Sequence, residues 1–149
     1  MNHSPAPNIF ETDDWEVGQG QIDGAHHIVR MRSTLPSLAD QELFSKLIIV
    51  TWRYESEESG MPDSDTHRRM QRFEDALESG TEARGTAFQA VSITGAGRKE
   101  WRYYAADTDA FMGSLNQDLR GHEEHPLEIA SFLDPEWNAL REFHSRSAQ

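Results

Sequence analysis

The side chains best suited to chemistry in this chain gather in one short segment, His122-Glu123-Glu124-His125. Imidazole and carboxylate groups are ordinary ligands of divalent metals. The spacing differs from the His-Glu-x-x-His pattern of metalloproteases, whose histidines lie four residues apart on one helix. Because Gly121 and Pro126 flank the segment, we expect a solvated loop. His122 and His125 are the candidate metal ligands, but a convincing third ligand is missing, so we expect no metal or other cofactor.

Other carboxylates lie side by side without the surroundings that acid-base catalysis needs. Such catalysis requires one carboxyl group that is desolvated beside one that is solvated, and adjacent acids in a polar loop meet neither condition. The chain has no cysteine nucleophile and no Gly-x-Ser-x-Gly elbow, and Gly95-Ala96-Gly97 lies in a hairpin rather than a phosphate-binding loop. We therefore expect a non-enzymatic protein. An enzyme or small-ligand-binding protein with a pocket between the N-terminal hairpin and the main sheet is the alternative.

Acidic residues dominate both the whole chain and one of its loops. The 14 Lys and Arg against 26 Asp and Glu give a net charge of -12, which repels nucleic-acid phosphate and anionic lipid. The segment from Glu55 to Asp65 predicts an exposed loop whose carboxylates would speed association with a basic protein. We expect a protein partner, for example a basic nuclease or toxin, and neither a nucleic acid nor a membrane. The candidate partner-binding acids are Glu55, Glu57 and Glu58.

The tripeptide Trp-Arg-Tyr occurs twice, at 52–54 and 101–103, in stretches with the character of β-strands. RNA-recognition motifs stack bases on aromatic residues of two such strands, but the acidic charge and the missing interleaved glycine favour a core instead. Alternation places Trp52, Tyr54, Trp101 and Tyr103 under the helices. The other face then carries Arg53, Arg102 and Tyr104, which are the remaining partner-binding candidates, with Tyr104 expected to be exposed.

Hydrophobic periodicity and turn residues predict an α+β fold. From the first Trp-Arg-Tyr strand onward the order is that of a ferredoxin-like β-α-β-β-α-β sandwich, with an N-terminal β-hairpin and an added C-terminal helix. The expected strands form a hairpin over 15–21 and 25–32, a single strand over 47–55, a second hairpin over 86–93 and 99–106, and a last strand over 127–133. The first expected helix covers 37–44, with Leu38, Leu43 and Phe44 as its apolar residues, and the second is capped by Ser64 or Asp65. The third helix is begun by Asp107 or Thr108, and in the last helix Asp134 is the cap and Pro135 takes the first helical position.

The 149 residues have the length of one domain. We expect a flexible N-terminal segment over 1–14, in which Ile9 and Phe10 find a groove, and a single α+β domain over 15–149. No apolar run is long enough for a signal-peptide core or a membrane span, so a cytoplasmic protein is expected. The strand parities also permit a homodimer through an exposed sheet face or edge.

Several short motifs share their order and spacing with one bacterial family. Trp15 opens the first strand, Gly60-Met61-Pro62 follows the first Trp-Arg-Tyr, Gly97-Arg98 leads to the second, and Asp134-Pro135-Glu136-Trp137 precedes Phe143. In these features the chain, from Trp15 to Phe143, resembles domain of unknown function 695. The resemblance implies a fold but no established activity. Some members look to be joined to a domain similar to the bacterial protein inhibitors of ribonuclease E. Those inhibitors are small, acidic and ferredoxin-like, so the resemblance implies regulation by protein binding.

Overall fold

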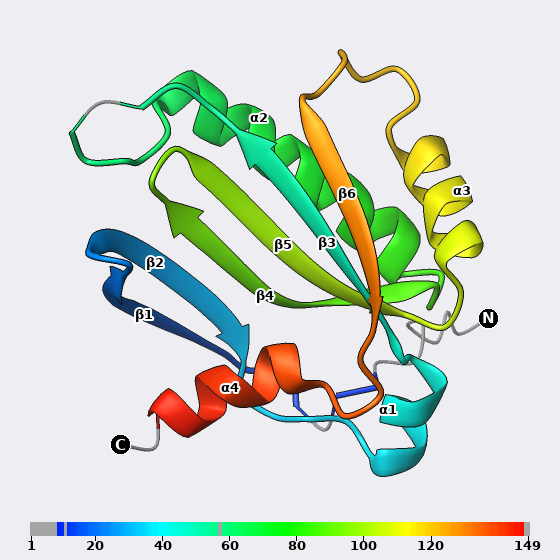
Figure 1. Ribbon diagram of the computed structural model, residues 1–149. Coiled ribbons are helices and arrows are strands. Elements are labelled where there is room, and N and C mark those ends of the chain that lie inside the picture. Colours follow the sequence, from blue (N-terminus) through cyan, green and yellow to red (C-terminus); the bar gives the residue numbers. More distant parts are fainter. Residues whose placement is uncertain (1–8, 11, 57, 148–149) are drawn as a thin grey trace.

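A six-stranded antiparallel sheet forms the centre of the computed structural model, which describes residues 9–10, 12–56 and 58–147 (Figure 1). The chain is therefore α+β, as the sequence predicts. In spatial order the strands are β1 (Trp15–Ile22), β2 (Ala25–Arg32), β4 (Ala87–Gly95), β5 (Arg98–Ala105), β3 (Lys46–Arg53) and β6 (Leu127–Leu133). The helices are α1 (Leu38–Leu43), α2 (Ser64–Leu77) with its π-helical continuation η1 (Glu78–Glu82), α3 (Thr108–Asp118) and α4 (Asn138–Ser147).

Two tight turns set the register of most of the sheet. Asp23 and Gly24 have φ angles of 52° and 80°, and Ala96 and Gly97 have φ angles of 52° and 78°. Two successive positive φ angles are the requirement of the hairpin turn that matches strand twist. The predicted β1–β2 and β4–β5 hairpins are thus confirmed, and the first turn brings Trp15 opposite Arg32.

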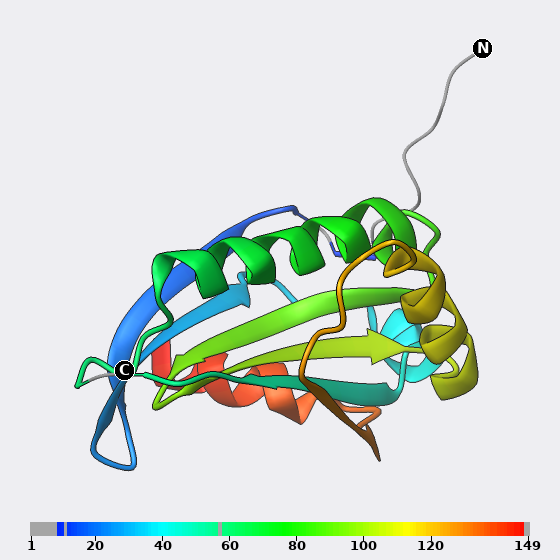
Figure 2. The same ribbon diagram turned by 90° about the horizontal axis from the view of Figure 1, so that it is seen from above.

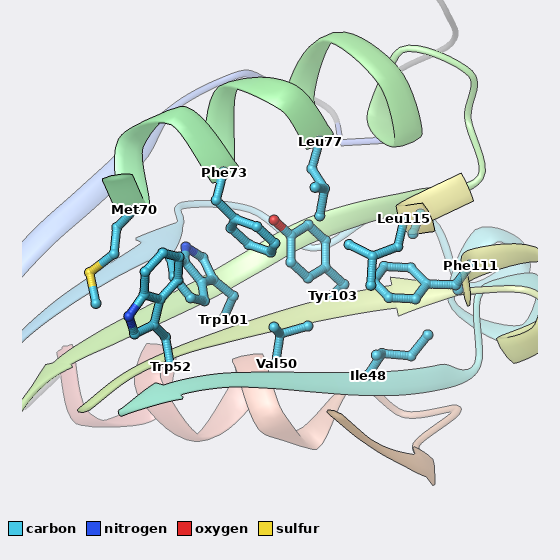
Figure 3. Close-up of a cluster of buried hydrophobic side chains, with 12 residues drawn as sticks. Ile48, Val50, Trp52, Met70, Phe73, Leu77, Trp101, Tyr103, Phe111 and Leu115 are labelled. Carbon is cyan, nitrogen blue, oxygen red and sulfur yellow. The ribbon is translucent and has the colours of Figure 1, made fainter. Parts of the chain in front are cut away.

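The first core lies between the sheet and the helices α2 and α3 (Figure 3). Trp52, Trp101 and Tyr103 project from β3 and β5, and all are buried as predicted. Alternation along each strand explains this, because every second side chain points to the same face. The helices contribute Met70, Phe73, Leu77, Phe111 and Leu115.

A second core lies on the opposite face, where α4 covers the sheet (Figure 2). Here the expectation that Tyr104 is exposed is wrong, because its side chain is fully buried. Its ring stacks on Trp137 with centroids 3.8 Å apart, and its hydroxyl donates to Asp134 Oδ2 at 2.7 Å. Phe10, from the segment before β1, packs against Phe88 and Trp137 in the same core.

The start of α4 differs from the prediction. The helix begins at Asn138, so Pro135 does not take the first helical position. Asp134 does cap it, accepting from the amides of Asn138 at 3.0 Å and Ala139 at 3.1 Å. The intervening Trp137 has a φ of 56°, which is uncommon for a bulky residue. Its indole nitrogen donates to the carbonyl groups of Gln41 and Phe44, which fixes α4 against α1.

Smaller differences occur at two other helices. In α1, Leu38 and Leu43 are exposed while Gln41 is buried, so the predicted apolar face is wrong except at Phe44. Gln41 is satisfied by donating to the Pro36 carbonyl at 2.8 Å. The N-cap of α2 is Asp63 rather than Ser64 or Asp65. Among the described residues, no helix is long and apolar enough to cross a membrane.

Candidate functional site

The acidic loop between β3 and α2 is fixed at its base to the β4–β5 turn. Tyr54 N–H donates to the Gly97 carbonyl at 2.9 Å, and Gly97 N–H donates to the Gly60 carbonyl at 3.1 Å. The Tyr54 hydroxyl donates to the same Gly60 oxygen at 2.7 Å. A side chain at Gly60 would place Cβ 2.8 Å from Ala96 N, and the φ of 72° also favours glycine. The loop is therefore held by specific backbone contacts.

This loop encloses a hollow of about 490 Å³, here called the acidic hollow. Glu55 and Glu58 on the loop are exposed and make no ion pair with any described residue, while Glu57 lies outside the described residues. Asp63 accepts from Thr66 N–H at 2.8 Å, and this hydrogen bond lowers its pKa. The acidic hollow is lined by Glu55, Ser56, Ser59, Met61, Pro62 and Asp63.

A second concave site, whose lining residues the sequence reasoning did not name, lies between α2 and the β1–β2 hairpin. This α2-side cleft has a volume of about 420 Å³. The guanidinium of Arg30 lies 3.8 Å from the ring centroid of Trp15, and that of Arg32 lies 4.3 Å from the rings of both Trp15 and Phe10. Such cation–π contacts hold the segment before β1 on the sheet. The lining residues are Asp13, Trp15, Arg30, Arg32, Glu74, Glu78, Glu82, Ala83, Phe88 and Gln89.

The two arginines of the cleft have different surroundings. Arg32 is buried and lies 2.5 Å from Asp13 and 3.8 Å from Glu82, and its Nε donates to the Gln89 carbonyl. It is a structural residue. Arg30 makes no ion pair within the described part of the chain, so its charge is available at the cleft. The Asp23-Gly24 turn is recognisable in the sequence and sets the register of the β1–β2 hairpin. Counting back from this turn would have predicted that Trp15 lies opposite Arg32.

Among the carboxyl groups that line the cleft, Glu82 has a raised pKa. Its Oε1 accepts from Gln89 N–H at 3.0 Å. Burial raises its pKa to about 7, against the smaller opposing effects of the Gln89 hydrogen bond and of Arg32. A carboxyl group with such a pKa changes protonation state near neutral pH and is suited to proton transfer.

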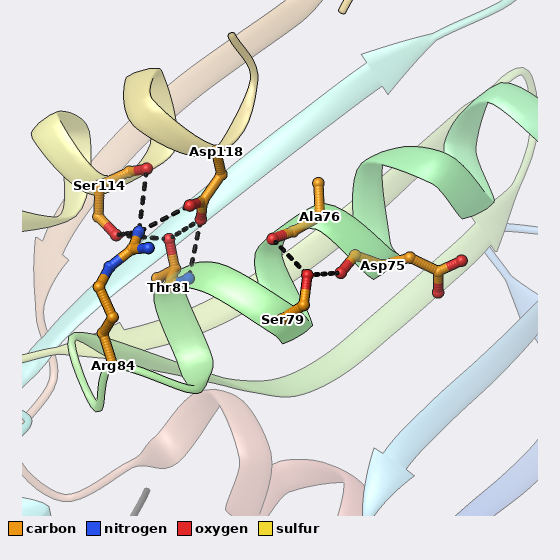
Figure 4. A network of polar contacts seen from close by, with 7 residues as sticks. All are labelled: Asp75, Ala76, Ser79, Thr81, Arg84, Ser114 and Asp118. Atoms are coloured by element: carbon orange, nitrogen blue, oxygen red, sulfur yellow. Dashed lines mark hydrogen bonds and ion pairs between the residues drawn. The ribbon is translucent and has the colours of Figure 1, made fainter.

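A polar network joins η1, the segment that ends at Glu82, to α3 (Figure 4). The carboxylate of Asp118 is almost completely buried and accepts from Thr81 N–H at 2.8 Å and from Arg84 at 2.7 Å. Ser114 accepts from Arg84 and lies 2.7 Å from Thr81 Oγ1. The helical segment continues through Gly80 into η1. Only glycine fits at this position, because Asp118 occupies the space that a Cβ would need.

A comparison with models of protein families shows to which family the chain belongs. The model of a family described as "Family of unknown function (DUF695)" matches residues 13–144. The chain belongs to the DUF695 family. The matched range includes every strand, the acidic hollow and the α2-side cleft. No curated protein and no solved structure matches the chain.

The other predicted partner-binding residues of this DUF695 domain do not form one exposed surface. Arg53 is exposed and donates to Glu128 at 3.1 Å. Arg102 lies beneath α4, where it forms ion pairs with Glu100 at 2.7 Å and Glu142 at 2.9 Å. Tyr104 is inside the second core. Parity correctly places Arg102 and Tyr104 on one face, but α4 covers that face.

The histidine pair lies beside the first core of the DUF695 domain. His125 Nε2 is 3.5 Å from His122 Nδ1, and the His125 ring packs on Trp52 with centroids 4.8 Å apart. Burial lowers the pKa of His125, and the neighbouring His122 and Arg69 lower it further. Glu123 forms an ion pair with Arg69. Within the described ranges, no group of three or more His, Cys, Asp or Glu side chains is arranged to hold a metal.

Proposed function

We propose that this DUF695 domain is a non-enzymatic, cytoplasmic regulator that binds a basic protein through the acidic hollow. The observation that carries the proposal is the combination of exposed, unpaired carboxylates with a loop held by Tyr54, Gly60 and Gly97. A loop fixed before binding loses less conformational freedom when a partner docks. The net charge of -12 would also steer a basic partner toward the domain.

The lining of the acidic hollow suits a lysine or arginine side chain. Such a side chain combines an apolar stem with a charged end. The stem would pack against Met61 and Pro62, and the charged end would lie near Glu55 and Asp63. The lowered pKa of Asp63 keeps that carboxylate charged. The chemistry of the hollow therefore selects a partner with a protruding basic residue.

A pull-down from bacterial lysate over a salt series tests this function. We expect the wild-type domain to recover a basic protein whose amount falls as salt rises, because screening weakens the attraction between exposed charges. The Glu55→Gln/Glu58→Gln variant should lose most of that protein. Glu16→Gln/Glu124→Gln changes net charge equally at other exposed sites and should retain it. Equal recovery by the two double variants, or recovery indifferent to salt, would refute the proposal.

A second candidate function is a small-ligand-binding protein or enzyme that uses the α2-side cleft. It is favoured by Arg30, a cation with no ion pair to a described residue, and Glu82, a carboxyl group with a pKa of about 7, which line the same cleft. These groups suit a ligand that carries an anion and a group able to exchange a proton. Thermal-shift screening against small carboxylic and amino acids tests it. A hit should be lost in Arg30→Gln, and a hit retained there would place the ligand elsewhere.

We also propose that β3, α2, β4, β5, α3 and β6 form a ferredoxin-like unit. The spatial order β4-β5-β3-β6, with antiparallel neighbours throughout, supports this topology. It is further supported by the presence of α2 and α3 in the same core. In this topology the hairpin of β1 and β2 is an extension of the sheet beyond β4, and α4 covers the face that the unit leaves open.

A further inference from the structure

A groove lies on the α4 side of the sheet, over Gly18 and Gly20 of β1, which have no side chains. Gly18 and Gly20 pair with Val29 and His27, so all four positions share one face of the hairpin. No atom lies within 4 Å of a Cβ built at either glycine. The resulting hollow has a volume of about 250 Å³, and its apolar lining comprises Ile22, Val29, Met31 and Phe143. Glycines in a strand can mark a place where a ligand approaches the backbone closely.

This hollow continues into a smaller one of about 150 Å³ between the hairpin and α4. Ile22, His27 and Phe143 line both, and together the two hollows are here called the hairpin groove. The smaller hollow also contains Arg102, which is neutralised by its ion pairs with Glu100 and Glu142. Arg98, which is exposed and forms no ion pair with a described residue, lines the smaller hollow as well. The part where the two hollows meet, at Ile22, His27 and Phe143, is apolar apart from the imidazole.

His27 places one hydrogen-bond acceptor in this apolar groove. The residue is only 6% exposed. Its Nδ1 lies 2.8 Å from the carbonyl oxygen of Ala25. Because a carbonyl oxygen can only accept, Nδ1 carries the proton and a neutral ring has its lone pair on Nε2. Nε2 has no partner among the described residues.

Close packing fixes the orientation of the His27 ring. A Cβ at Gly95 would lie 2.7 Å from His27 Cδ2 and 2.5 Å from the His26 carbonyl oxygen, so the ring lies directly against the strand backbone. The ring cannot turn freely toward solvent while Nδ1 is bound to Ala25. Nε2 remains accessible from the groove, and a donor that enters the groove can form a hydrogen bond with it.

We propose that the hairpin groove binds an uncharged aromatic or heteroaromatic small molecule that donates one N–H or O–H hydrogen bond to Nε2 of His27. The open space above the backbone of Gly18 and Gly20 accommodates a ring, and Val29, Met31 and Phe143 bury the apolar faces of that ring. The hydrogen bond from the ligand's N–H or O–H group to His27 Nε2 fixes the orientation of the ligand in the groove. This site shares no lining residue with the acidic hollow and does not depend on a protein partner.

Indole and N-methylindole provide the matched probes, because they differ in the N–H donor. In amide NMR titrations of the full chain, indole should shift Gly18, Gly20 and His27 in a saturable manner. N-methylindole should bind about fivefold more weakly, as expected for the loss of one hydrogen bond. Imidazole nitrogen NMR should show Nδ1 protonated in the free protein and a change at Nε2 when indole is added.

Three variants test whether indole binds in the hairpin groove or elsewhere on the protein. Gly20→Val adds a side chain whose Cβ has no atom within 4 Å and should abolish indole binding by filling the groove, while Gly113→Ala, at a similarly open glycine in α3, should leave it unchanged. His27→Phe should bind both probes equally. Absence of indole binding to the wild-type chain, equal affinity for the two probes, or binding retained by Gly20→Val would overturn the proposal.

Discussion

Tyr103 and Tyr104 are neighbours in β5 whose hydroxyl groups have opposite surroundings. Both side chains are fully buried, on opposite faces of the sheet. Tyr104 donates to Asp134 at 2.7 Å, whereas the Tyr103 hydroxyl has no hydrogen-bond partner in the described structure. A buried hydroxyl group stabilises a fold only when it is paired.

Phenylalanine substitutions should therefore have unequal effects on stability. We expect Tyr104→Phe to lower the free energy of unfolding by about 1–2 kcal/mol, since it removes a hydrogen bond to a charged group. Tyr103→Phe should change it by less than about 0.5 kcal/mol or raise it. Urea denaturation of both variants measures the difference. An equal loss in the two would contradict the assignment of the hydroxyl groups.

Glu82 makes stability depend on pH in a defined window. Its pKa is raised from 4.5 to about 7 by burial, and Arg32, Glu74 and Glu78 are the charged groups that act on it. The folded protein therefore holds the proton more tightly than the unfolded chain does. This contribution is fully present below pH 4.5 and is lost as pH rises to about 7.

Glu82→Gln removes this titration while keeping an acceptor for Gln89 N–H. The free energy of unfolding of the variant, minus that of the wild type, should increase by about 3 kcal/mol between pH 4.5 and 7 and stay level above pH 8. Denaturation at a series of pH values measures it. Using the difference cancels the titration of the other carboxylates. A difference that is constant across the window would show that Glu82 ionises normally.

At the scale of elements, alternation predicts which face a strand residue occupies but not what covers that face. Trp101, Tyr103 and Tyr104 all lie on the expected sides. The exposure of Tyr104 was mispredicted because α4 reaches it only through the turn at Trp137, whose positive φ no local propensity indicates. The apolar residues Trp137, Leu140 and Phe143 did require burial, and that was the available signal.

The candidate sites were predictable to different degrees. The acidic loop follows from composition, since Gly60, Pro62 and its glutamates are all turn or surface residues. The α2-side cleft depends on contacts between distant segments: Glu82 becomes buried only because η1 continues past Gly80 and is bound to α3. The acceptor on His27 depends on a tautomer set by the Ala25 carbonyl. Neither property has a sequence signature.

The junction of η1 with α3 should be sensitive to Asp118. We expect Asp118→Ala to lower the free energy of unfolding by about 3 kcal/mol, because Thr81 N–H and the Arg84 guanidinium lose their buried partner. Gln117→Ala, at an exposed position of the same helix, is the control and should cost less than about 0.5 kcal/mol. Thermal and urea unfolding measure both. A neutral Asp118→Ala would mean that the network does not hold η1.

At the scale of the whole molecule, the sheet ends in two edge strands of different character. β1 contains Gly18, Gln19, Gly20 and Gln21 in its second half, where the glycines lower strand propensity and offer no apolar side chain to a partner. β6 is richer in apolar residues, and Phe132 and Leu133 are 52% and 69% exposed. Of the two edges, β6 is therefore the one suited to pairing with a second copy.

Self-association through β6 must overcome repulsion between two chains of net charge -12. Salt screens that repulsion but leaves apolar contacts intact. We therefore expect the mass measured by light scattering to rise from monomer toward dimer with protein concentration, and to do so at lower concentration when salt is added.

Two single lysine substitutions test which edge is used. Leu133→Lys should keep the protein monomeric, whereas Val17→Lys should dimerise as the wild type does. The two positions are matched, since Leu133 is 69% and Val17 is 67% exposed and each substitution adds one positive charge. Because both variants reduce the net negative charge equally, a difference between them reports the position of the interface. A wild-type chain that stays monomeric at high concentration and high salt, or a dimer that survives Leu133→Lys, would eliminate pairing through β6.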